Sequence, residues 1–167
     1  FFAEAVTLAH VSRPLVLAQG LDASQFDVHF AHHPRYRGML GELTFKEHHL
    51  NSITPQQFTA ALAKGQPLDD SATLASYVEE DLALIESVRP DIVVGDFRLT
   101  LAESAEKAQV PYVSITNAYW SPYTRQNYPV PELPVVQKLG PRIGQWLFNV
   151  VRPLVFILHT RPLNQVR

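Results

Sequence analysis

Residues 89–120, RPDIVVGDFRLTLAESAEKAQVPYVSITNAYW, constrain the fold more than any other part of the sequence. Residues 92–94 are a short β-branched run that ends just before Gly95 and Asp96, and such a run predicts a strand buried on both faces. Leucine and alanine at helical spacing follow, and residues 112–116 then predict a second strand. A strand–helix–strand unit of this kind predicts an α/β protein with a Rossmann-like open parallel sheet and helices on both faces.

The same patterns extend along the rest of the chain. Alternating apolar and polar residues predict strands, whereas apolar residues three and four positions apart predict helices. With 167 residues, the predicted elements fit one domain. In chain order we expect a strand over residues 1–5, a helix from Ser12, a strand over 25–31, a short strand over 43–45, a helix capped by Thr54, a long helix from Asp69 or Asp70 to Val88, a proline-rich loop over 121–136, and an apolar helix from Pro141 that Arg152 and Pro153 interrupt.

Composition excludes several classes of function. The formal net charge of −2 gives no basic surface for nucleic acid. The absence of cysteine excludes disulfides and thiolate chemistry, and it agrees with a cytoplasmic location. The sequence opens at Phe1 inside a predicted strand and stops at Arg167 directly after a helical pattern, so we expect a domain truncated at both ends.

The known phosphate-binding motifs are missing from the sequence. Neither G-x-x-x-x-G-K-[ST] nor G-x-G-x-x-G follows any predicted strand. If the protein uses a nucleotide, we therefore expect most of it to be held by residues outside this sequence.

His10 is the strongest single candidate for chemistry. It follows the first predicted strand, and Asp96 ends the central one, so both belong at the carboxyl edge of the sheet, where α/β proteins bind their ligands. A neutral imidazole can take a proton from a hydroxyl, and a carboxylate behind it fixes the tautomer and stabilises the imidazolium. The alternative is structural: His10 caps the first helix or packs in a loop, and Asp96 caps the next helix.

The remaining histidines and acids give weaker signals. Neighbours in sequence point apart in an extended chain, so the pairs at 32–33 and 48–49 do not predict a metal site, and we expect solvated loop residues instead. The acids Glu79, Glu80 and Asp81 predict a solvated helix face. The sequence therefore predicts no metal site.

Aromatic residues gather in the loop behind the second strand of the central unit. Tyr119, Trp120, Tyr123 and Tyr128 follow Asn117, which lies at the predicted functional edge. Aromatic rings on such a loop suit an apolar, ring-bearing or acyl ligand. These rings could equally seal the end of the sheet beneath the last helix, and the sequence does not distinguish this packing role from ligand binding.

Two segments of the chain resemble glycosyltransferases of the GT-B fold, of the UDP-glycosyltransferase and macrolide-antibiotic glycosyltransferase type. AEAVTLAHVSRPLVLAQGL is similar to the family's opening strand, G-H-V-N-P turn and apolar helix, with Ala9 in place of the glycine and the proline displaced to Pro14. RPDIVVGDFRLTLAESAEKAQVPYVSITNAYWSP resembles the family's strand–Asp–helix–strand segment. The likeness covers nearly the whole chain and is weakest over residues 34–69.

This resemblance implies the N-terminal, acceptor-binding half of an inverting glycosyltransferase, inactive as a fragment. His10 would be the general base that deprotonates an acceptor hydroxyl, and Asp96 would orient it. The nucleotide-sugar donor would be held mainly by a C-terminal Rossmann-like domain that this sequence lacks, without a metal or other cofactor. A small, mostly apolar acceptor would contact Phe97, Asn117, Tyr119, Trp120 and Tyr123.

A stand-alone, flavodoxin-like binding module is the alternative, with the loop over residues 119–128 holding a small ligand or a partner. The gene downstream of Arg167 separates the two readings, because another α/β domain with a nucleotide-sugar motif supports the enzyme and a stop codon supports the module. The interrupted helix from Pro141 is too short to span a bilayer. It could lie on a membrane surface, so peripheral membrane contact is a further expectation.

Overall fold

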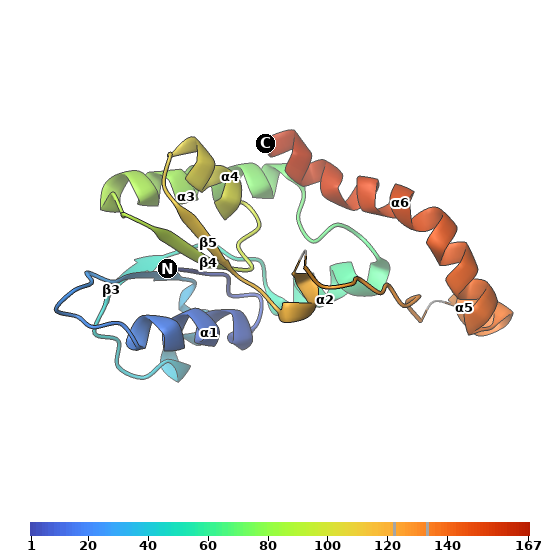
Figure 1. The fold of residues 1–167 in the computed structure, drawn as a ribbon, viewed down its shortest axis with the longest axis horizontal. Helices are drawn as coiled ribbons and strands as arrows, with labels where there is room; N and C mark the ends of the chain where they lie inside the picture. Colours follow the sequence, from blue (N-terminus) through green and yellow to red (C-terminus); the bar gives the residue numbers. More distant parts are fainter. Residues whose placement is uncertain (122, 133) are drawn as a thin grey trace.

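In the computed structural model, which describes residues 1–121, 123–132 and 134–167, the chain folds around a five-stranded parallel sheet (Figure 1). The strand order is β3-β2-β1-β4-β5, and β1 therefore lies at the centre, paired with β2 and β4. The predicted Rossmann-like α/β class is confirmed. The strands are β1 (Phe2–Ala3), β2 (His29–His32), β3 (Lys46–His49), β4 (Val93–Asp96) and β5 (Tyr112–Ile115).

Helices cover both faces of the sheet, as Figure 1 shows. Helix α1 (Leu8–Gln19) lies on one face, and α3 (Ser71–Val88) and α4 (Leu101–Lys107) lie on the other. Side chains alternate between the faces, so Ala3 packs in one buried cluster and its neighbour Phe2 in the other. The α1 cluster comprises Ala3, Ala5, Val11, Leu15, Ala18, Phe30 and Leu40, and the α3/α4 cluster comprises Phe2, Ala31, Leu50, Ile85, Val93 and Leu101.

Gly95 allows α4 to pack closely against β4. A Cβ atom at this position would overlap the side chain of Leu101 and lie 3.3 Å from the ring of Tyr112. The glycine thus serves close packing here, directly before the strand ends at Asp96.

The N-terminal half departs from the predicted boundaries. Helix α1 begins at Leu8 behind Thr7, earlier than the predicted start at Ser12, and it accommodates the buried Pro14 in its interior. The second strand is shorter than predicted, and the third falls at β3, where a loop had been expected for His48 and His49. The cause is that β3 is an edge strand with an exposed, polar side, so it lacks the apolar pattern that identifies buried strands. A 3₁₀ turn, η1 (Pro34–Met39), connects β2 to this region.

The two helices between β3 and β4 begin at the predicted caps. Helix α2 (Pro55–Lys64) starts with a capping box, in which Thr54 and Gln57 bond to each other's backbone amide. Helix α3 starts behind Asp70, whose carboxylate accepts from the amide of Thr73 at 2.7 Å. These caps fix where both helices enter the fold.

The C-terminal part is more helical than predicted. After a 3₁₀ turn, η2 (Ala118–Trp120), the chain forms α5 (Pro134–Leu139), which begins within the predicted loop over residues 121–136, and then α6 (Pro141–Val166). Helix α6 runs without interruption through Pro153, contrary to prediction. Because that part of α6 is largely exposed, solvent can satisfy the carbonyl that the missing proline N–H leaves free.

Helix α6 crosses the molecule and returns to α3 and α4 (Figure 1). Near its end Gln165 accepts from the hydroxyl of Ser71 at 2.9 Å, and the carbonyl of Val166 accepts from Lys107 at 3.2 Å. None of the helices in the described ranges is long and apolar enough to cross a membrane. Along its exposed side α6 carries an apolar stripe of Ile143, Trp146, Leu147, Val150, Val151, Leu154, Ile157 and Leu158.

Candidate active site

The structure brings His10 and Asp96 together. His10 lies in the first turn of α1, just after β1, and Asp96 is the last residue of β4. The Nδ1 atom of His10 lies 2.9 Å from Oδ1 of Asp96, although 86 positions separate the two residues in sequence. The Asp96 side chain is buried, whereas that of His10 keeps 13% of its surface exposed. The geometry is therefore that of an accessible imidazole backed by a buried carboxylate.

Arg13 is the third member of this site, and sequence reasoning missed it. Its Nη2 atom lies 2.6 Å from Oδ1 of Asp96 and 2.8 Å from Nδ1 of His10. Its Nη1 atom donates to the side-chain oxygen of Asn117 at 2.8 Å. The spacing of three residues from His10 to Arg13 places both side chains on one face of α1. This spacing is the sequence signal that could have identified Arg13 as a site residue.

Phe97 holds the His10 ring from the other side. The two rings are stacked, with centroids 4.4 Å apart and planes 16° from parallel. Phe97 has a φ of 60°, a left-handed conformation that is unusual for a bulky residue. Such strain persists only where the surroundings impose it, and it clusters at functional sites. Here the turned backbone places the Phe97 ring flat against the imidazole.

The predicted aromatic loop contributes unevenly to the site. Trp120 approaches Phe97, with ring centroids 6.1 Å apart, and Tyr119 packs edge-on against Trp120 at 5.6 Å. The amide of Asn117 donates to the hydroxyl of Tyr119 at 3.0 Å. The Tyr123 side chain is 98% exposed, so the structure does not bring it against the other rings.

A depression of about 240 Å³ opens beside Asp96 and Arg13. Its lining includes Arg13, Asp96, Phe97 and Trp120. The wall is mixed: Ser114 and Thr116 add hydroxyl groups to the charged side chains, and Leu99 and Ile115 add apolar surface. The depression offers room for part of a small ligand beside Asp96, the partner of His10.

A buried ion-pair cluster lies immediately behind the site, centred on Arg98. Arg98 is 2% exposed and donates to Glu4 at 3.0 Å, to Glu80 at 2.8 Å and to Asp81 at 2.9 Å. The expectation of a solvated face for Glu79, Glu80 and Asp81 is thus wrong for Asp81, which is fully buried and also accepts from Thr100 at 2.7 Å. Burial raises the pKa of Asp81, and the Arg98 cation opposes that rise.

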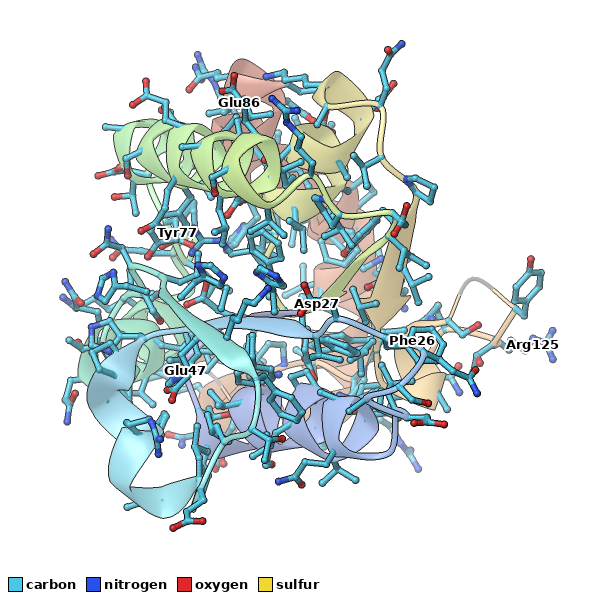
Figure 2. The ribbon with its side chains drawn as sticks, turned by 90° about the vertical axis from the view of Figure 1, so that its left-hand side faces the viewer. Phe26, Asp27, Glu47, Tyr77, Glu86 and Arg125 are labelled. Atoms are coloured by element: carbon cyan, nitrogen blue, oxygen red, sulfur yellow. The ribbon has the colours of Figure 1, made fainter. Side chains whose placement is uncertain are left out.

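This cluster attaches α3 to the edge of the sheet. The guanidinium of Arg98 lies over the ring of Tyr77, 3.9 Å from its centroid. Figure 2 shows Tyr77 on the side of α3 that faces the sheet, whereas Glu86 points outward from the same helix. Because Arg98 follows Asp96 by two residues, these ion pairs also hold the backbone that carries Asp96, the carboxylate partner of His10.

The expectation of solvated loop residues is wrong for His32, which is buried in β2, and for His48, which is partly buried in β3, whereas His33 does lie in a loop and His49, although in β3, is exposed. His48 stacks on His29, with ring centroids 5.0 Å apart, and His33 and His49 lie 5.7 Å apart. His32 is buried and contacts Glu47 at 3.2 Å. Among the described residues, no group of three or more histidine or acidic side chains has the arrangement of a metal site.

The fold and the site together define a class: a Rossmann-like α/β protein with a histidine–carboxylate pair at the carboxyl edge of its parallel sheet. Comparison with known proteins narrows this class. Over all 167 residues the chain is 46% identical to a PGL/p-HBAD biosynthesis rhamnosyltransferase of Mycobacterium tuberculosis. It is 42% identical to a PGL/p-HBAD biosynthesis glycosyltransferase of the same species and to an inactive PGL/p-HBAD biosynthesis glycosyltransferase of Mycobacterium bovis.

The chain is therefore homologous over its full length to mycobacterial glycosyltransferases. It spans 37%, 39% and 46% of the length of these three relatives, respectively. No family model matches the chain. No solved structure gives a significant match either.

Proposed function

We propose that this chain is the acceptor-binding part of an inverting glycosyltransferase that transfers a sugar from a nucleotide-sugar donor to a hydroxyl group. The contact between His10 and Asp96 carries the proposal, because it joins an accessible base to a buried carboxylate at the sheet edge where α/β proteins bind ligands. The homology to named glycosyltransferases supports it independently.

In the proposed reaction His10 removes the proton of the acceptor hydroxyl through Nε2. The resulting oxygen attacks the anomeric carbon of the sugar, and the bond from that carbon to the nucleotide phosphate breaks with its electron pair on the phosphate oxygen. Attack from the opposite face inverts the configuration. Asp96 accepts a hydrogen bond from Nδ1, which leaves Nε2 free as the base and stabilises the imidazolium that forms.

The acceptor lies, in this proposal, in the depression beside Phe97. Phe97 and Trp120 provide apolar surface in its wall. Asn117 and Tyr119, which bond to each other next to Trp120, would add polar contacts to the acceptor. Tyr123, whose side chain is exposed, would reach an acceptor that extends beyond the depression. A small, mostly apolar acceptor fits this distribution. Donor binding falls mainly to a second Rossmann-like domain outside this sequence.

A binding module without turnover is the second candidate. One relative, 42% identical over the whole chain, is named an inactive glycosyltransferase, so homology alone does not establish turnover. Ligand binding at the same depression would then persist without any contribution from the base.

The proposal is tested by assaying sugar transfer by the full-length product of the gene that encodes this chain. We expect His10→Ala to lower the transfer rate by about 10² to 10⁴-fold, the usual contribution of a general base. Circular dichroism should match that of the unsubstituted protein, because the Arg13 cation still compensates Asp96. A His10→Ala protein with a near-normal rate would refute the role of His10, and ligand binding without transfer would favour the module.

A further inference from the structure

Helix α6 carries its apolar stripe on a surface that the rest of the described structure leaves largely uncovered. The eight side chains of the stripe recur at helical spacing, so they form one continuous band along the helix. Each of them is between 36% and 65% exposed. Figure 1 shows α6 on the outside of the molecule, farther from the sheet than α3 and α4. Single exposed apolar residues are ordinary, whereas a contiguous band of this kind indicates an interaction surface.

The other side of α6 is fixed to the protein. Gly144 is buried where the helix meets α5, and a Cβ atom there would lie 2.9 Å from the side chain of Val136. The guanidinium of Arg152 lies over the ring of Tyr128, 4.5 Å from its centroid, and Phe156 packs edge-on against the same ring. These contacts fix the rotation of the helix about its axis, so the stripe faces outward.

The charge of this part of the chain is as uneven as its polarity. Residues 134–167 hold five of the 14 lysines and arginines and none of the 16 aspartates and glutamates, so their formal charge is +5 and that of residues 1–133 is −7. Arg142 and Arg161 flank the stripe in sequence, and both are exposed. A charge asymmetry of this size between two parts of a chain indicates a polyanionic partner, either nucleic acid or an anionic membrane.

The apolar stripe separates these partners. Nucleic acid presents phosphates but no apolar layer that the stripe could enter. A second copy of the chain would bring two segments of charge +5 together, and their repulsion opposes such a contact. A bilayer with anionic headgroups offers both an apolar layer for the stripe and negative charge for the arginines. Trp146 lies within the stripe, and tryptophan favours the headgroup level of membranes.

We propose that α6 is a membrane-docking helix that lies flat on an anionic bilayer, with the apolar stripe at the boundary between headgroups and acyl chains. Arg142 and Arg161 contact headgroup phosphates, and the acidic remainder of the chain is directed away from the membrane. This inference is independent of the proposed function, because it uses none of the residues at the His10–Asp96 site.

Vesicle flotation of the full-length gene product tests this docking. We expect the protein to float with mixed vesicles, made of equal parts of phosphatidylcholine and phosphatidylglycerol. Vesicles of phosphatidylcholine alone should bind it at least about tenfold less, since each basic side chain near an anionic surface contributes about fivefold. Val150→Glu should lower binding to the mixed vesicles by about tenfold or more, because it places a carboxylate among apolar side chains that enter the bilayer.

Val16→Glu is the matched control. Val16 is 66% exposed on α1 and Val150 is 61% exposed on α6, so both variants add one carboxylate at an exposed helical valine. Val16→Glu should float like the unsubstituted protein. Circular dichroism of both variants should be unchanged, because neither valine belongs to the buried clusters.

Trp146 gives a second readout that needs no added charge. The difference in tryptophan emission between the protein and Trp146→Phe isolates the signal of Trp146, which should shift to shorter wavelengths when mixed vesicles are added. A protein that does not float, an unshifted Trp146 signal, or undiminished binding by Val150→Glu would each overturn the inference. A dimer that Val150→Glu abolishes would assign the stripe to a second copy of the chain, and it would overturn the inference as well.

Discussion

Replacement of Arg98 by methionine tests whether the buried cluster holds the site-bearing edge of the sheet. Arg98 has no exposed side-chain surface and compensates Glu4 and Asp81, which are themselves buried. Methionine fills much of the same volume but leaves these carboxylates without their cation. Removing one partner of a buried ion pair costs about 3–5 kcal/mol, whereas a domain is stable by about 5–15 kcal/mol. We therefore expect Arg98→Met to lose a large part of the free energy of unfolding.

Urea denaturation at several pH values measures this loss. Burial raises the pKa of Asp81, and without the opposing Arg98 cation the rise should be larger. An acid whose pKa is raised by folding contributes stability below its unfolded pKa and loses it as the pH rises. The deficit of Arg98→Met should consequently shrink as the pH is lowered from neutral, and Asp81→Asn in that background should restore part of it. A deficit below about 1 kcal/mol at neutral pH would refute the reasoning.

Three further predictions concern packing, a buried acid and the apolar stripe of α6. Gly95→Ala should lower the free energy of unfolding by about 1–3 kcal/mol in urea titrations, because the added methyl overlaps Leu101; an unchanged midpoint would contradict this packing. Burial, with a contribution from Glu4, raises the pKa of Asp69 to about 6. The contribution of this carboxyl to the free energy of unfolding is therefore lost as the pH rises through that value. Asp69→Asn should therefore stabilise the chain by about 1–2 kcal/mol near pH 7.5 and hardly at all below pH 4, and an equal effect at both pH values would be inconsistent with ionisation. Residues 134–167 contain five lysines or arginines and no acid, so the stripe suits an anionic bilayer. The chain should sediment with vesicles containing phosphatidylglycerol and much less in Trp146→Glu, and absence from both pellets would exclude the contact.

Local sequence signals were sufficient for the central unit and for the pair at its edge. The β-branched run before Asp96 and the helix caps at Thr54 and Asp70 depend on neighbouring residues alone, so they could be recognised without the fold. His10 and Asp96 could be placed together because parallel strands end at a common edge.

The misses have a common physical cause. The burial of Asp81 depends on Arg98, and the strand at His48 depends on pairing with β2, so both are decided by partners distant in sequence. Arg13 has ordinary helical spacing from His10, but its contact with Asp96 arises only after the sheet has formed. Tertiary contacts of this kind leave no local pattern to recognise.

A double-mutant cycle on His10 and Asp96, measured as sugar-transfer rate in the gene-encoded protein, tests the central claim most directly. If Asp96 acts through His10, Asp96→Asn should slow transfer when His10 is present and have little further effect in His10→Ala. Rate losses that simply multiply in the double variant would contradict the account, because the two side chains would then act independently.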